Sequence, residues 1–141
     1  MTAQPAVGPT FVEVERADVV VMFVQVPDTV PEIQEGMQRL ESVVGELRGR
    51  RFFGTVHPEN STYRACVQQR DGDRPKNLGL ETGTVPGGRY LRARLQGEPP
   101  ELYERIAPTA ALLEQAATWD TSRPLIEYYR RRNQVDVLMP V

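Results

Sequence analysis

The stretch FVQVPDTVPEIQEGM, residues 23–37, decides the fold because it joins the end of an apolar strand to the start of an amphipathic helix. The strand signal covers residues 19–26, VVVMFVQV, which are apolar and rich in β-branched side chains. After this strand in the sequence, apolar residues recur at steps of three and four residues, which places them on one face of a helix. These residues are Ile33, Met37, Leu40, Val44 and Leu47. Pro31 and Gly49 fit the preferences of helix termini, so we predict a helix that ends just before Gly49.

The same order of residue types returns 69 positions later, in RARLQGEPPELYERI, residues 92–106. Pro31 and Glu32 correspond there to Pro100 and Glu101, and a hairpin signal follows each helix. Chance similarity between two amphipathic units is the alternative, but the matched Pro-Glu-apolar helix start argues against it. We predict an α+β fold of two pseudo-symmetric βαββ modules, with antiparallel sheets, helices packed on one face and a groove between the modules.

With 141 residues the chain fits one domain. We place module one at about 11–69 and module two at about 87–141. Residues 70–86 lie between them, are rich in Gly, Pro, Asp and Asn, and are interpreted as a connecting loop. Residues 1–10 are expected to form a mobile tail. Pro108 removes one helical hydrogen bond and should bend or divide the second helix.

The composition excludes several classes of partner. Seventeen basic and nineteen acidic residues leave a net charge of −2, which provides no attraction for nucleic acid or for an anionic membrane surface. The chain has no apolar run long enough to span a bilayer. Its start, MTAQPAVGPT, lacks the basic region and apolar core of a signal peptide. We therefore expect a cytoplasmic protein, monomeric or a homodimer, with no nucleic-acid and no membrane partner.

The single cysteine and the single histidine give little support for redox or metal chemistry. Cys66 lies in a strand-like run, YRACVQQ, and is expected to be a small buried core residue. His57 lies in the turn-like HPEN without a second His or Cys nearby, whereas a zinc site needs three or four ligands. We expect His57 to be exposed in a turn, and we predict no metal and no cofactor.

One acidic residue interrupts an apolar strand near the end of the chain, in LIEYYR, residues 125–130. Because side chains alternate along a strand, Glu127 and Tyr129 share one side, and Ile126 and Tyr128 share the other. We predict that Ile126 and Tyr128 face the helices, so that Glu127 and Tyr129 point into the groove at the seam between the modules. A carboxylate beside aromatic rings there would attract a lipophilic cation.

A buried carboxylate needs a polar partner, and an internal ion pair is the alternative to a ligand site. Arg92 or Arg94 could supply that partner. Trp119 either caps the groove or, as we favour, fills the core at the end of the second helix. Tyr63 and Tyr103 are expected at the edge of the core rather than against a ligand.

Three segments resemble the GyrI-like small-molecule-binding family, also found as the effector-binding domain of multidrug-responsive transcription regulators. They are VPGGRYLRARLQG, with a Gly-x-Tyr strand entry, RPLIEYYRRR, with a Pro-x-x-Glu-x-Tyr strand, and the closing VDVLMPV. The resemblance implies a pocket between the two modules with Glu127 as its polar centre, next to Tyr129 and Tyr90. The chain shows no helix-turn-helix segment, so a direct transcriptional role is not expected.

We expect the groove to bind an amphipathic, aromatic or cationic small molecule such as a drug or toxin, for sequestration or sensing. The expected ligand contacts are Glu127, Tyr129, Tyr90, Phe53, Trp119 and Arg92. Some relatives in the family that the chain resembles are hydrolases that open strained rings of toxic natural products. In that alternative Glu127 is the catalytic acid or base and Tyr129 orients the reactants. A protein-binding inhibitor is the third possibility.

Overall fold

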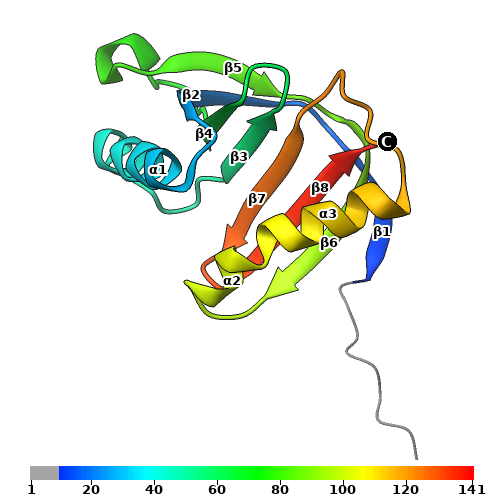
Figure 1. Ribbon diagram of the computed structural model, residues 1–141. Helices are drawn as coiled ribbons and strands as arrows, with labels where there is room; N and C mark the ends of the chain where they lie inside the picture. Colours follow the sequence, from blue (N-terminus) through cyan, green and yellow to red (C-terminus); the bar gives the residue numbers. More distant parts are fainter. Residues whose placement is uncertain (1–9) are drawn as a thin grey trace, which may run out of the picture.

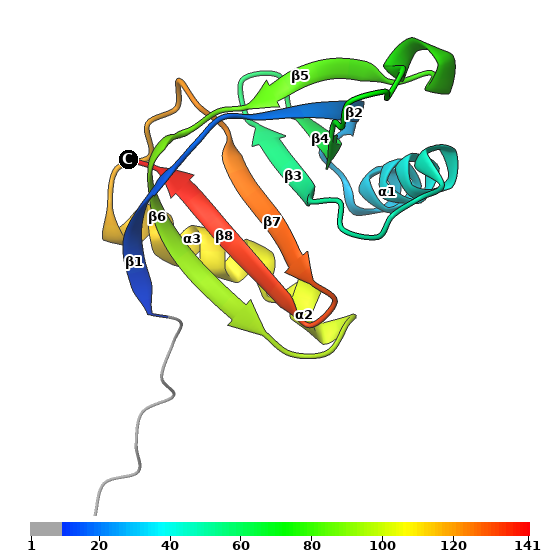
Figure 2. The ribbon, with the colours of Figure 1, turned by 180° about the vertical axis from the view of Figure 1, so that it is seen from behind.

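The computed structural model describes residues 10–141, which form an α+β fold with one eight-stranded antiparallel sheet (Figures 1 and 2). The strand order is β1-β6-β8-β7-β3-β4-β2-β5. The strands are β1 Phe11–Arg16, β2 Val19–Pro27, β3 Phe52–His57, β4 Thr62–Gln68, β5 Glu81–Val85, β6 Gly88–Gln96, β7 Leu125–Arg131 and β8 Gln134–Pro140. The helices are α1 Val30–Val44, α2 Glu101–Glu104 and α3 Ile106–Ala116, with a short 3-10 helix, η1, at Pro75–Leu78.

The helices lie on one face of the sheet, as predicted. Helix α1 packs on β2 and β4, and α3 packs on β8 and β6 (Figure 1). Each helix closes its own apolar cluster against the strands, with Leu40 of α1 and Leu113 of α3 fully buried. Between the parts of the sheet covered by α1 and by α3, β3 pairs with β7, so strands from the first and second halves of the chain meet there. A pseudo-symmetric relation between the halves stays a prediction.

The opposite face carries a third apolar cluster that contains no helix residue. Ile126 is buried in it, Tyr128 packs against it, and the ring of Tyr128 stacks on Phe53 with centroids 4.9 Å apart. The prediction that Ile126 and Tyr128 face the helices is therefore wrong. Leu125 and Tyr129 instead pack in the cluster of α3, and Glu127 lies on the same side as these two residues.

Two strands lie outside the predicted strand set. Strand β1 pairs with β6, and β5 pairs with β2, so each extends the sheet at one edge. Strand β5 and helix η1 occupy most of the segment 70–86, which was predicted to be a connecting loop. Residues 1–10 were predicted to form a mobile tail, and residues 1–9 of this segment lie outside the described part of the chain.

Both helices end or divide differently from the prediction. Helix α1 ends at Val44 because Gly45, at φ 76°, turns the chain there, and Leu47 lies beyond the helix. The second helix is divided, as expected, into α2 and α3, and the break falls at Arg105, three residues before Pro108. Pro108 lies in the first turn of α3, where its missing N–H costs no helical hydrogen bond within α3. Within residues 10–141 the helices are too short or too polar to cross a membrane.

Candidate functional site

The site is built around Glu127 of β7, which is buried on the helix side of the sheet where β7 meets β3. Its Oε1 accepts a hydrogen bond from the hydroxyl of Tyr129 at 2.6 Å and a second from the hydroxyl of Tyr63 at 2.8 Å. The two hydroxyl oxygens lie 3.2 Å apart. Tyr63 comes from the first half of the chain and Tyr129 from the second, so both halves contribute to the site.

Gly54 makes room for the contact between Tyr63 and Glu127. On β3, Gly54 lies directly opposite Glu127 of β7 on one side and opposite Ala65 of β4 on the other. The ring of Tyr63 leans from β4 across β3, and a Cβ atom on Gly54 would lie 1.7 Å from the Tyr63 hydroxyl oxygen. Only glycine leaves this passage open, which is the structural reason for a glycine inside a strand.

Burial raises the pKa of the Glu127 carboxyl, and the negative charge of Asp28 raises it further. The hydrogen bonds from Tyr129 and Tyr63 lower this pKa and offset part of the effect. Burial and the charge of Glu127 in turn raise the pKa values of Tyr63 and Tyr129 well above the ordinary range, so both remain neutral donors. Glu127 forms no ion pair with an arginine, lysine or histidine of residues 10–141.

The side of Glu127 that lies nearer to solvent is aromatic and acidic. Tyr129 is half-buried, and the edge of the Tyr103 ring, from α2, meets it with centroids 6.0 Å apart. Tyr103 is itself 45% exposed, so this ring can move without disturbing the core. Asp28 follows β2 directly and adds a second negative charge close enough to affect the pKa of Glu127. A cation that approached Glu127 would therefore meet aromatic faces and negative charge.

The structure brings together two of the six residues predicted to contact a ligand, Glu127 and Tyr129. Phe53 and Tyr90 are buried in the cluster on the opposite face, and Arg92, two residues after Tyr90 on β6, points to that face as well. Trp119 packs in the α3 cluster, and its Nε1 donates a hydrogen bond to the Arg123 carbonyl oxygen at 3.0 Å. This packing agrees with the core position that we favoured for Trp119.

The alternative of an internal ion pair with Glu127 is wrong. Arg94 donates from Nε and Nη2 to the two carboxylate oxygens of Asp136, at 2.8 and 3.1 Å, on the face away from the helices. Arg92 lies on that face too. Tyr63, expected at the core edge, is fully buried and is a direct partner of Glu127. The glycine in FFGTV was a usable signal for this close approach.

The remaining reactive side chains lie outside this site. Cys66 is buried, as predicted, and burial raises the pKa of its thiol to about 12. His57 was expected to be exposed in a turn, but it ends β3, is largely buried and has Nε2 2.8 Å from the Thr55 hydroxyl oxygen. Burial lowers the pKa of His57. Residues 10–141 contain no group of three or more His, Cys, Asp or Glu side chains placed to hold a metal ion.

Comparison with known proteins gives the fold. Neither a protein-family model nor a curated protein matches the chain. The integron cassette protein VCH_CASS2, from the mobile metagenome of Vibrio cholerae, has a TM-score of 0.72 at 17% identity, covering 93% of this chain and 95% of that one. SAV2435 bound to tetraphenylphosphonium has a TM-score of 0.63 at 16% identity, covering 94% and 93%. The EcmrR C-terminal domain has a TM-score of 0.64 at 14% identity, covering 94% and 96%.

The chain shares the fold of these three proteins. At these identities the likeness extends to the fold alone. Two cavities of about 380 and 800 Å³ lie away from Glu127, the first beside the link between β1 and β2 and the second beside η1. Glu127 is buried and lines neither of these two cavities, and the groove expected around it stays a prediction.

Proposed function

We propose that the protein binds a lipophilic aromatic cation next to Glu127, on the side of Asp28 and Tyr103, and that it sequesters or senses this molecule. The observation that carries the proposal is the buried carboxylate of Glu127, which has two neutral hydroxyl partners and no ion-pair partner within residues 10–141. Burying a carboxylate costs several kcal/mol, roughly, unless a positive charge compensates it. A bound cation would supply that charge.

The side chains around Glu127 fit an aromatic cation better than a small inorganic ion. Tyr129 and Tyr103 present ring faces and edges beside the carboxylate, and rings attract organic cations through their quadrupoles. Access requires the exposed Tyr103 to rotate away from Tyr129, which opens the path to Glu127. SAV2435, whose structure contains bound tetraphenylphosphonium, shares the fold of this chain and supports this choice of ligand class.

A thermal-shift titration with tetraphenylphosphonium tests the proposal. A ligand present at a hundred times its Kd stabilises the folded state by about 2.7 kcal/mol, which corresponds to a rise in Tm of roughly 6–10 °C for a chain of this size. Neutral triphenylphosphine oxide should give little shift because it has the rings without the charge. Affinity for the cation should also increase from acidic to neutral pH, since the cation favours ionised Glu127, whose pKa is raised.

Matched variants identify the carboxylate that binds the cation. Glu127→Gln should lose most of the tetraphenylphosphonium shift and its pH dependence. Glu13→Gln removes the same charge from an exposed position on β1 and should keep both. An undiminished shift in Glu127→Gln would show that the cation binds elsewhere, and the proposal would then be wrong.

A ring-opening hydrolase is the second candidate, favoured by the raised pKa of Glu127. A carboxyl that keeps its proton to higher pH can protonate a leaving carbon or heteroatom, while water adds to the other end of the opened bond and returns a proton to the carboxylate. The Tyr129 hydroxyl, 2.6 Å from the carboxyl, would orient the reactants. Turnover of a cyclopropane-bearing compound that is abolished in Glu127→Gln would favour the enzyme. Stabilisation by tetraphenylphosphonium without turnover would favour binding alone.

A further inference from the structure

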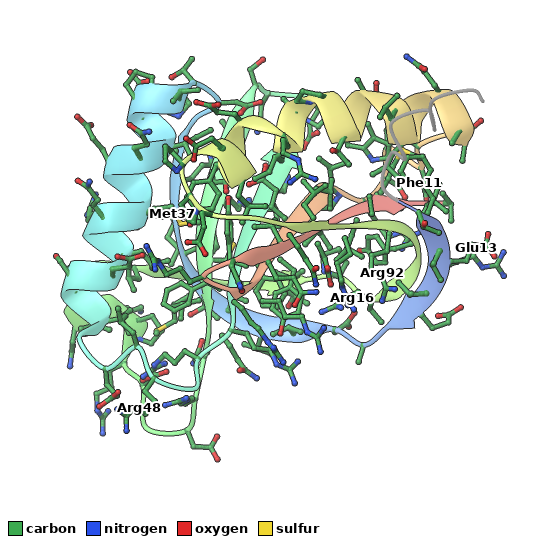
Figure 3. All side chains as sticks on the ribbon, turned by 90° about the horizontal axis from the view of Figure 1, so that it is seen from below. Phe11, Glu13, Arg16, Met37, Arg48 and Arg92 are labelled. Carbon is green, nitrogen blue, oxygen red and sulfur yellow. The ribbon has the colours of Figure 1, made fainter. Side chains whose placement is uncertain are left out.

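The face of the sheet away from the helices carries arginines that lack carboxylate partners. Arg16 on β1 and Arg92 on β6 both lie on this face, on the side away from α3 (Figure 3). Arg94 pairs with Asp136, whereas Arg16, Arg51 and Arg92 form no ion pair with any residue of 10–141. The protein is weakly acidic overall, so this local excess of positive charge is not a reflection of its composition.

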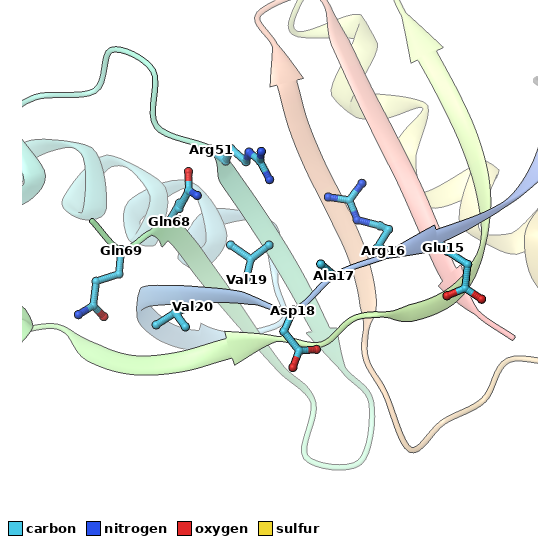
Figure 4. Close-up of a pocket in the computed structure, with 9 residues that line it drawn as sticks. All are labelled: Glu15, Arg16, Ala17, Asp18, Val19, Val20, Arg51, Gln68 and Gln69. Carbon is cyan, nitrogen blue, oxygen red and sulfur yellow. The ribbon is translucent and has the colours of Figure 1, made fainter. Parts of the chain in front are cut away.

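Two of these arginines converge on the cavity of about 380 Å³ beside the link between β1 and β2. Figure 4 shows the guanidinium groups of Arg16 and Arg51 turned toward each other across the cavity. Glu15 and Asp18 also line it, but their carboxylates point away from the space between the two arginines (Figure 4). Asp18 is occupied elsewhere, because its Oδ1 accepts a hydrogen bond from the Gly87 N–H at 2.6 Å.

The surrounding structure fixes Arg16 in place. Its guanidinium carbon lies 5.0 Å from the centre of the Tyr128 ring, which in turn stacks on Phe53. Its backbone is held against Gly87, where a Cβ atom would lie 2.5 Å from the Arg16 carbonyl oxygen. Burial lowers the pKa of Arg16, and the charge of Arg51 lowers it as well, although Tyr128 and Asp136 oppose this. The two guanidinium groups thus face each other, and neither forms an ion pair with a carboxylate of residues 10–141.

We propose that the cavity between Arg16 and Arg51 binds a small phosphate monoester. Guanidinium groups present planar pairs of N–H donors that match phosphate oxygens, and two of them neutralise a dianion. The cavity volume lies at the lower end of the range for small-molecule sites, which suits a small ester rather than a nucleotide. This site lies on the opposite face of the sheet from Glu127 and does not depend on the cation-binding proposal.

The test is a titration of the protein with inorganic phosphate and, separately, with glycerol phosphate. Binding is monitored by the chemical shifts of the protein in NMR spectra, at a constant ionic strength set with chloride. Both probes should bind the wild-type protein, with shift changes centred on the link between β1 and β2. Arg51→Gln should weaken binding about tenfold, since a lost charge-assisted hydrogen bond has this effect on affinity. Arg16→Gln should weaken it similarly. Arg48→Gln removes a neighbouring exposed charge that does not line the cavity, and it should bind like wild type (Figure 3).

Three results would overturn the proposal. These are no binding of either probe by the wild-type protein, wild-type affinity in both Arg16→Gln and Arg51→Gln, or an equal loss in Arg48→Gln. The last result would show that net charge, not this pair of arginines, attracts the anion. Arg51 is exposed, so the Arg51→Gln variant is expected to fold. If the Arg16→Gln variant does not fold, Arg51→Gln alone decides the outcome.

Discussion

An alanine in place of Gly54 would put a Cβ atom 1.7 Å from the hydroxyl oxygen of Tyr63 and 2.4 Å from its Cζ. Real Cβ atoms essentially never approach a neighbour closer than 3.0 Å, so the ring must move by more than 1 Å or β3 must bend. Tyr63 is 1% exposed, so its ring is enclosed by the core and cannot simply swing into solvent. The displacement would also break its 2.8 Å hydrogen bond to Glu127.

The expected cost follows from these two effects. Overpacking a well-filled core costs about 1–3 kcal/mol. Loss of a hydrogen bond to a charged group adds about 1.5–3 kcal/mol. Gly54→Ala should therefore lower the free energy of unfolding by roughly 2.5–6 kcal/mol, a large fraction of the stability of a typical domain. Urea denaturation measures this value directly, and an unchanged m-value would show that both states keep their compactness.

A double-mutant cycle with Tyr63→Leu tests the cause. Leucine keeps apolar volume at this position but lacks the hydroxyl, Cζ and Cε2 atoms that collide with the new Cβ. In the Tyr63→Leu background, Gly54→Ala should cost almost nothing, or stabilise by up to about 1 kcal/mol, because glycine is unfavourable inside a strand. An equal cost of Gly54→Ala in both backgrounds would refute the reasoning, since the clash would not then involve the ring of Tyr63.

Three further outcomes are expected. The pKa of Glu127 in the folded protein is raised above 4.5, so its contribution to stability is complete below pH 4.5 and is lost as the pH rises through the folded pKa. Glu127→Gln should therefore reduce the fall in unfolding free energy with rising pH, measured by urea denaturation at a series of pH values. Arg50 holds the pKa of Asp73 at about 2, so the stability from this ion pair is present above pH 3.8 and is lost as the pH falls through about 2. The Arg50→Gln variant should therefore unfold at a higher pH than the wild-type protein in an acid titration. Cys66 is buried and the pKa of its thiol is raised to about 12, so it should react with an aromatic disulfide reagent only as fast as local or global unfolding exposes it. The absorbance of the thiolate that the reagent releases measures this rate in native buffer and in urea.

Local patterns in the sequence were sufficient for most of the elements. The three- and four-residue spacing located α1, and Ile33, Met37 and Leu40 of that spacing pack in its apolar cluster. Strand β1 was detectable too, because FVEVER alternates apolar and charged residues, as expected for an edge strand. Strand β5, ETGTV, offers no such pattern, since its place in the sheet depends on pairing with β2.

Alternation could not decide which side of β7 faces the helices, because both rows of this strand contain aromatic and apolar residues. The choice depends on which side can hold the carboxylate of Glu127. That side is set by Tyr63, which is 64 positions away in the sequence, and by the passage that Gly54 leaves open. No local signal connects these residues, so the face of Glu127 is a tertiary property.

The pairing of β3 with β7 fixes both faces of the molecule at once. In this register Gly54 lies opposite Glu127, and the next residues, Phe53 and Tyr128, lie opposite each other. A slip by one residue would move Glu127 to the face that carries Arg16 and would put Tyr128 under the helices, because the side-chain period is two. The hydrogen bonds to Glu127 on one face and the stacking of Phe53 on Tyr128 on the other thus stabilise the same register. For this reason the acidic site on the helix side and the basic cavity on the other side depend on one strand pairing, and a variant that shifts it would affect both.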